Sequence, residues 1–157
     1  MVVYPLNFSS EYYQFYILDA QSEMETDAPD FWCDAAGERR LAIGKDILGV
    51  TIATYGNVKG EIRILSNKPA LLPNADHVVE ASLRFPSGIL QVRDCTGSEL
   101  QLAIPLSKTT YRIRISSHNL GSVMNDEGDD FYTIEIWRSR FAKPNIMKTF
   151  LNNPFVS

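Results

Sequence analysis

The side chains that could act as a nucleophile, a general base or a metal ligand are few in this 157-residue sequence. His77 and His118 are the only histidines, and no G-x-S-x-G motif supplies a nucleophile for either. Cys33 and Cys95 stand alone, with neither CxxC nor paired His–Cys spacing. The glycine-rich phosphate motifs G-x-x-x-x-G-K-S/T and G-x-G-x-x-G are also absent. We therefore expect no catalytic residue, no metal ligand and no cofactor, and we predict that the protein is not an enzyme.

Acidic side chains, in contrast, are grouped. The segment Asn125-Asp126-Glu127-Gly128-Asp129-Asp130 holds four acids in six residues. An EF-hand calcium loop needs acids at alternate positions and a Glu at its twelfth position. The acids of this segment do not have that spacing, so we favour a solvated acidic loop. A second stretch, residues 11–38, has no Lys or Arg and contains the acids Glu11, Asp19, Glu23, Glu25, Asp27, Asp30, Asp34 and Glu38.

Acids without interleaved bases repel one another in the folded protein, and a cationic partner would relieve that repulsion. Trp32 lies within the acidic stretch of residues 11–38 and offers the aromatic anchor that binding hot spots commonly contain. We therefore predict that the functional contact uses Asp126, Glu127, Asp129 and Asp130, with Trp32, Glu25, Asp27 and Asp30 in support.

Composition limits the class of protein. The net charge is 15 − 19 = −4 and the pI is about 5.1, which argues against direct binding of nucleic acid. No apolar run approaches the ~20 residues of a membrane span. The start, MVVYPLNF, shows no signal peptide, so we expect one cytoplasmic domain over residues 1–157, without membrane insertion and with reduced cysteines.

The elements that position these side chains are strands, because apolar and polar residues alternate with period two. Clear alternation covers residues 58–65, 77–85, 100–104, 111–115 and 131–137, and weaker signals cover residues 12–18, 49–55 and 89–93. Turn residues separate these runs, which is typical of an antiparallel sandwich or barrel. We predict an all-β fold, an antiparallel β-sandwich of about eight strands, with a short helical turn at residues 145–151. Residues 19–40 lack strand periodicity and are expected to form a surface excursion.

The same alternation predicts burial. Arg112, Arg114 and Glu135 should face outward or toward polar partners, and Trp137 is out of phase, so it either faces a second layer or is exposed. The side chains expected in the core are Val79, Leu83, Ile113, Ile115, Ile134 and Ile136.

Two segments resemble the competence protein J family. Tyr12-Tyr13-Gln14-Phe15, followed by an acidic loop with Asp30-Phe31-Trp32, is similar to the aromatic Y-x-Q-F strand and the acid beside Trp with which that family opens. The run from Ser98 through Tyr111-Arg112-Ile113-Arg114 is similar to a pair of strands in that family. The resemblance implies a β-rich, non-enzymatic inhibitor of a DNA-uptake nuclease.

Residues 139–157 depart from the family pattern, and only the acidic loop next to Trp32 is carried over as a binding feature. His77-Val78-Val79-Glu80-Ala81 and Gly128-Asp129-Asp130-Phe131-Tyr132 resemble segments of many small, uncharacterised bacterial proteins.

Three function classes follow. We favour a protein-binding module, an inhibitor of or immunity protein to a nuclease, whose acidic loops meet a basic protein. The alternative is a sandwich that binds a carbohydrate or small molecule in an aromatic groove, since the chain has 8 Phe, 7 Tyr and 2 Trp, although most of these occupy core positions. The third is an enzyme with a carboxylate pair, a weak signal when 19 acids make such pairs inevitable.

Overall fold

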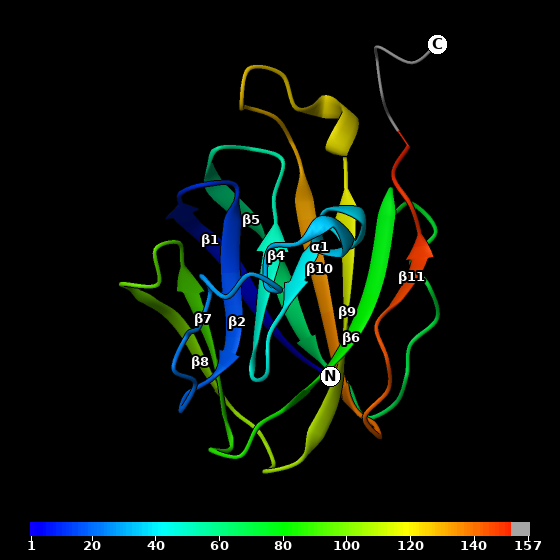
Figure 1. Cartoon of the computed structure of the whole chain (residues 1–157). Helices are drawn as coiled ribbons and strands as arrows, with labels where there is room; N and C mark the ends of the chain where they lie inside the picture. The colour runs from blue at the N-terminus through cyan, green and yellow to red at the C-terminus, as the bar shows by residue number, and fades with distance from the viewer. Residues whose placement is uncertain (152–157) are drawn as a thin grey trace.

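The computed structural model describes residues 1–151, which are built mainly from strands in two sheets that lie face to face (Figure 1). This confirms the predicted all-β sandwich. The sequence predicted about eight strands and missed three short or edge strands and a small helix. In chain order the elements are β1 (Val2–Ser10), β2 (Gln14–Asp19), α1 (Asp34–Arg39), β3 (Leu41–Ile43), β4 (Ile47–Thr51), β5 (Gly56–Ile64), β6 (His77–Arg84), β7 (Ile89–Asp94), β8 (Leu100–Pro105), β9 (Thr110–His118), the 3₁₀ turn η1 (Leu120–Ser122), β10 (Phe131–Arg138) and β11 (Asn145–Lys148).

The six-stranded sheet, sheet A, has the strand order β1-β5-β10-β9-β6-β11. Its neighbours are antiparallel except for β5 and β10, which run parallel with Ile134 opposite Ile62. The two strands approach closely at Gly60, where a Cβ atom would lie 2.2 Å from the carbonyl oxygen of Tyr132. Glycine therefore permits this pairing, because any side chain would collide with the partner backbone. The five-stranded sheet, sheet B, is antiparallel with the order β3-β4-β2-β7-β8.

One apolar core fills the space between the sheets, as expected when each strand turns alternate side chains inward. The six core residues predicted from the alternation (Val79, Leu83, Ile113, Ile115, Ile134 and Ile136) are all buried there. Sheet B contributes Phe15, Ile17, Val50, Leu90 and Val92 from the opposite side.

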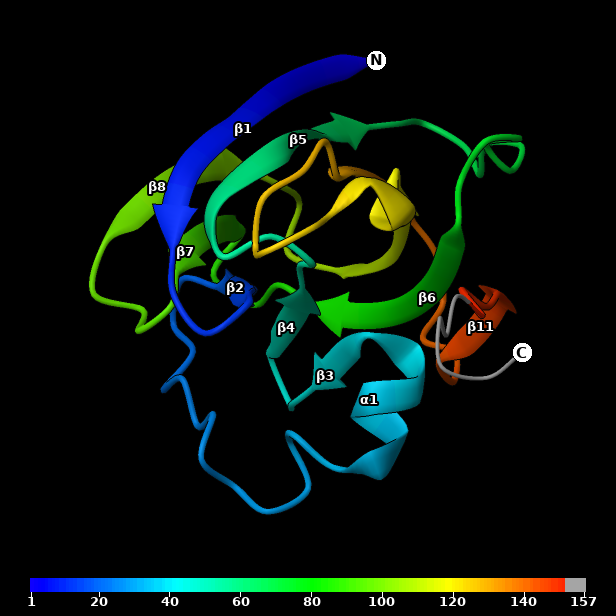
Figure 2. The same cartoon turned by 90° about the horizontal axis from the view of Figure 1, so that it is seen from above.

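The outer face of sheet B is covered by residues 20–33 and α1, which pass across it in Figure 2. A second apolar cluster lies under this cover, with Phe31 and Ala36 packed among residues of β2, β3 and β4. Gly49 in β4 makes room for the cover, since a Cβ there would lie 2.7 Å from a ring carbon of Trp32. The surface excursion predicted for residues 19–40 is thus a packed cover over the sheet.

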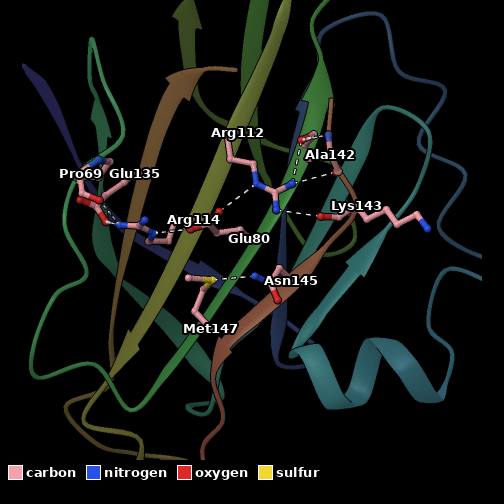
Figure 3. A network of polar contacts seen from close by, with 10 residues as sticks. Pro69, Glu80, Arg112, Arg114, Glu135, Ala142, Lys143, Asn145 and Met147 are labelled. Atoms are coloured by element: carbon pink, nitrogen blue, oxygen red, sulfur yellow. Dashed lines mark hydrogen bonds and ion pairs between the residues drawn. The ribbon is translucent and has the colours of Figure 1, made fainter. Parts of the chain in front are cut away.

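The outer face of sheet A carries buried charge. Glu80 lies opposite Arg114 in the β6–β9 register, and Arg114 lies opposite Glu135 in the β9–β10 register. Glu80 binds both arginines, at 3.1 Å from Arg112 Nε and 2.9 Å from Arg114 Nε (Figure 3). We call Glu80, Arg112, Arg114 and Glu135 the outer charge cluster. All four are buried, which confirms the prediction that the latter three meet polar partners rather than the apolar core.

A second layer covers this cluster. Arg114 donates to the carbonyl oxygens of Pro69 and Ala70, and Arg112 donates to those of Ala142 and Lys143. Trp137 is only 4% exposed, with the Arg114 guanidinium 5.1 Å from its ring centre. Of the two positions predicted for Trp137, the structure therefore shows the one that faces a second layer.

The helical turn predicted at residues 145–151 is wrong. Residues Asn145–Lys148 form β11, which pairs with the edge of β6. The physical reason is that β6 offers unpaired backbone groups there, and a strand satisfies them while a helical turn does not.

Within residues 1–151, no helix is long and apolar enough to cross a membrane. That the whole chain 1–157 forms one domain stays a prediction, and residues 152–157 lie outside the described part.

Candidate protein-binding surface

Four connections meet at one end of the sandwich; in Figure 1 three of them lie toward the top, and the one between β7 and β8 lies lower, at the left. They are residues 11–13 between β1 and β2, 52–55 between β4 and β5, 95–99 between β7 and β8, and 119–130 between β9 and β10. Backbone hydrogen bonds join them: the N–H of Glu11 donates to Cys95 O at 3.4 Å, and that of Tyr55 donates to Asp126 O at 3.0 Å. We call this region the loop end.

Residues 125–130, the acidic loop, project from the loop end. Asp126, Glu127 and Asp129 are exposed, as predicted for a solvated loop. A tight turn holds them in place, because the backbones of Met124 and Glu127 exchange hydrogen bonds of 2.8 and 3.0 Å. The backbone N–H of Asp129 also donates to the Ser122 hydroxyl at 2.9 Å. The three carboxylates are therefore presented from a defined backbone.

Asp130 is separated from the other three acids. It is 3% exposed, and its carboxylate accepts hydrogen bonds from the backbone N–H groups of Ala53 and Thr54, at 3.3 and 3.1 Å. The Thr54 hydroxyl and the Tyr132 hydroxyl also donate to it. Burial and this carboxylate together raise the pKa of Tyr132. Asp130 thus fastens the β4–β5 connection to β10 and has no carboxylate oxygen to offer a partner.

Exposed tyrosines stand beside the acidic loop. Tyr12 is 63% exposed, Tyr13 39% and Tyr55 45%. The rings of Tyr13 and Tyr55 lie edge to face, with centres 5.1 Å apart, and the Tyr13 hydroxyl donates to Asp126 Oδ1 at 2.8 Å. That hydrogen bond is the main reason why the pKa of Tyr13 is raised. Aromatic rings and carboxylates therefore form one surface at the loop end.

Two hollows flank Tyr55, which lines both of them. The first also contains Met124, Lys59, Glu127 and Asp129. The second contains Glu11, Asp94 and Glu99 and has no lysine or arginine in its lining.

Trp32 and Asp30 belong to a different surface. Trp32 is 37% exposed and packs edge to face on Phe31, with ring centres 5.5 Å apart, on the outer face of sheet B. Asp30 lines a hollow around the β3–β4 turn together with Glu23, Glu25, Lys45 and Asp46. That hollow shares no residue with the two beside Tyr55.

Sequence reasoning missed Tyr55 as a neighbour of the acidic loop, and it missed Glu11, Asp94 and Glu99, which line the second hollow beside Tyr55. Tyr12 and Tyr13 were placed in a strand, whereas both precede β2 and adopt left-handed backbone angles with φ of 57°. One signal was available: Tyr55 directly precedes Gly56-Asn57, residue types that favour turns, and an aromatic residue beside a turn is more exposed than one inside a strand. In the structure these two residues begin β5.

The remaining candidates for chemistry are placed as follows. Cys33 and Cys95 are both free thiols. Each histidine is engaged, with His77 Nε2 2.8 Å from Arg39 O and His118 Nε2 3.1 Å from Thr133 Oγ1. Among the described residues, no three His, Cys, Asp or Glu side chains gather to hold a metal ion.

The fold is a β-sandwich of the ComJ-like type. The structure is similar to that of ComJ from Bacillus subtilis, inhibitor of the DNA-degrading activity of NucA, with a TM-score of 0.68 and 17% identity over 88% of this chain and 100% of ComJ. It is also similar to a protein described as crocagin biosynthetic gene J, with a TM-score of 0.58 and 21% identity over 88% of this chain and 98% of that one. No protein-family model and no curated protein matches the sequence.

Proposed function

We propose that this protein is a non-enzymatic inhibitor that binds a nuclease. The observation that carries the proposal is the ComJ-like fold, which extends over all of ComJ, an inhibitor of a DNA-degrading activity. The exposed acidic surface of the loop end supports it, because a nuclease must offer cationic groups to the phosphates of DNA. Carboxylates on a protein can occupy such groups in place of phosphate.

The contact that we propose uses Asp126, Glu127 and Asp129, which share one exposed loop. Asp130 is excluded from the contact because its carboxylate is buried and fully engaged. Trp32 and Asp30, on the outer face of sheet B, are a secondary proposal. Exposed charges of one sign accelerate association with an oppositely charged site more than they add affinity.

A DNA-degradation assay tests the function. The purified protein is titrated into NucA and, separately, into a nuclease from its own organism, with plasmid DNA as substrate. We expect stoichiometric loss of cleavage with at least one of them. Unchanged cleavage by both at a large molar excess of the protein would overturn the proposal.

A pair of matched variants tests the contact. Glu127→Lys/Asp129→Lys and Glu23→Lys/Glu25→Lys change the net charge equally, but at different surfaces. We expect the first to slow association by about tenfold at low salt and to flatten its dependence on salt, and the second to have a smaller effect. Equal effects would show that overall charge matters and that the loop end does not.

The carbohydrate alternative is less well supported. Sugar rings stack on flat aromatic platforms, but the planes of Tyr13 and Tyr55 are inclined by 72°. Binding of a glycan on an array, abolished by Tyr55→Leu, would favour that alternative.

A further inference from the structure

Three tyrosines at the loop end expose their rings to solvent. Tyr12, Tyr13 and Tyr55 come from two connections far apart in the sequence, and Met124, which is 75% exposed, extends the same surface. Single exposed apolar residues are ordinary, but a contiguous group of them marks an interaction site. Tyrosine is also among the residues enriched at such sites.

This surface is preorganised. The Tyr13 ring is fixed by its hydrogen bond to Asp126 and by its edge-to-face contact with Tyr55, while the Tyr55 backbone is hydrogen-bonded to Asp126 O. Ordering interface side chains is a usual cost of association, and binding a partner would cost little side-chain entropy in these two rings because they are already fixed.

Carboxylates lie on both sides of the rings. Glu127 and Asp129 line the hollow on one side of Tyr55, and Glu11, Asp94 and Glu99 line the hollow on the other. Lys59 lines the first hollow, with its ammonium 3.5 Å from Gly128 O. A side chain bound at Tyr55 would thus contact an aromatic ring that lies between two acidic hollows.

The side chain that suits this arrangement is arginine. A guanidinium is planar, stacks on an aromatic face and donates in pairs to a carboxylate, whereas a lysine ammonium is a compact, strongly hydrated point charge. The protein contains the same combination in its interior, where Arg114 donates to Glu80 at 2.9 Å and lies 5.1 Å from the ring centre of Trp137.

We infer that Tyr55 and its two flanking acidic hollows bind an arginine-containing segment of a protein partner. This inference rests on the proposed function only for the identity of that partner, the nuclease, and specifies the chemistry by which the partner is held. Lysine-rich segments would bind more weakly, and nucleic acid would be repelled.

An NMR titration tests the inference with defined probes, a nonapeptide of alternating arginine and glycine and its lysine counterpart. We expect amide shifts concentrated at residues 11–13, 55–57 and 124–129, and an affinity several-fold higher for the arginine peptide. Tyr55→Leu should remove that preference, and Tyr55→Phe, which keeps the ring, should retain it. Both variants leave the buried core unchanged, and the amide spectrum of each confirms its fold.

Three outcomes would overturn the inference: equal affinity for both peptides, shifts spread over residues 20–30 as well, or an arginine preference that survives Tyr55→Leu. Competition in the nuclease assay separates the two proposals. Inhibition of the nuclease that the bound arginine peptide does not relieve would leave the function standing and reject this surface as the contact. Peptide binding as expected, with no nuclease inhibited, would leave the surface standing and reject the nuclease as partner.

Discussion

The charged side chains of the outer charge cluster are buried and paired, whereas those of the acidic loop are exposed and of one sign. In the cluster, Glu80 lies between Arg112 and Arg114, and carbonyl groups of two covering segments accept further hydrogen bonds from both guanidinium groups. In the loop, Asp126, Glu127 and Asp129 share one sign and face solvent. The cluster pairs opposite charges out of reach of solvent, although Glu135 Oε1 lies there without a hydrogen-bond partner, 3.6 Å from Arg114 Nη1. The acidic loop contains no Lys or Arg, so its exposed carboxylates are the ones that another molecule can reach.

The neighbours Asp129 and Asp130 show the same contrast at the scale of one residue. Asp130 receives two backbone N–H groups and two hydroxyl groups, whereas the Asp129 side chain is exposed. A buried carboxylate must be satisfied by the protein, while an exposed one costs little to leave hydrated. Substitutions of the buried charged residues should therefore reduce stability, and substitutions of the exposed acids should reduce binding.

The largest expected effect is that of Glu80→Gln. Removing this carboxylate leaves the buried Arg112 without an anion and leaves Arg114 only its longer, 3.6 Å contact with Glu135. We expect a loss of about 3–5 kcal/mol in the free energy of unfolding. Urea denaturation measures it. The matched control is Glu61→Gln, which breaks the partly exposed 2.7 Å pair with Arg63 and should cost no more than about 1 kcal/mol. Similar losses in both variants would mean that the buried ion pairs of the outer charge cluster contribute no more to stability than an exposed ion pair does.

A smaller loss is expected for Asp130→Asn. The amide keeps the shape of the side chain but removes the charge that receives the N–H groups of Ala53 and Thr54, at a cost of about 2 kcal/mol. Asp129→Asn should change stability by less than about 0.5 kcal/mol. Thermal unfolding of the two variants side by side checks the contrast, and equal melting temperatures would contradict it.

The next effect depends on pH and arises at His77, the first residue of β6. His77 Nδ1 accepts the backbone N–H of Phe150 at 3.1 Å while Nε2 faces Arg39 O, an arrangement that fits the neutral ring. Burial lowers the pKa of His77, and the positive charge of Arg40 adds to this. Burial likewise lowers the pKa of His118.

Because both folded-state pKa values lie below the ordinary value of 6.5, the unfolded chain binds protons more readily than the folded one. Stability is therefore full above pH 6.5 and declines as the pH falls below it. Urea titrations from pH 7.5 to 5 should show this decline, and His77→Gln should make it shallower. An unchanged slope in the variant would exclude His77 as a contributor.

The smallest change in stability is expected for Glu127→Lys/Asp129→Lys. Both side chains are exposed, and replacing them relieves repulsion with Asp126, so the free energy of unfolding should stay within about 0.5 kcal/mol of the original value. A loss above 2 kcal/mol in urea denaturation would show that the acidic loop is a structural element.

Much of the fold could be predicted because alternation is a local signal. The strand of residues 131–138 shows its two faces in its own sequence, and Ile134 and Ile136 are buried accordingly. The β1 strand was missed although Tyr4, Leu6 and Phe8 alternate with polar or small residues, since Pro5 reads as a strand breaker. Proline fits there because β1 lies at the edge of sheet A.

The site was less predictable because its geometry depends on distant contacts. Asp130 looks like its neighbours in the sequence, and only the backbone N–H groups of Ala53 and Thr54, more than 70 residues away, distinguish it. Tyr55 and the acidic loop likewise meet only in the folded chain. Alternation also places Arg112 and Arg114 on an outer face correctly, but the segments that bury them belong to other parts of the chain.

The parallel contact between β5 and β10 has a consequence for how the chain is made. In sheet A, β10 is the strand that joins β1 and β5 to β9 and β6. During synthesis on a ribosome, β5 is complete long before residues 131–138 emerge. The backbone groups of β5 that pair with β10 therefore stay unpaired while roughly half of the protein is made. Contacts that span so much sequence close slowly, and unpaired strand edges attract other chains. A nascent chain stalled before Phe131 would therefore hold two separate halves of sheet A, and it would be the form of this protein most prone to aggregate.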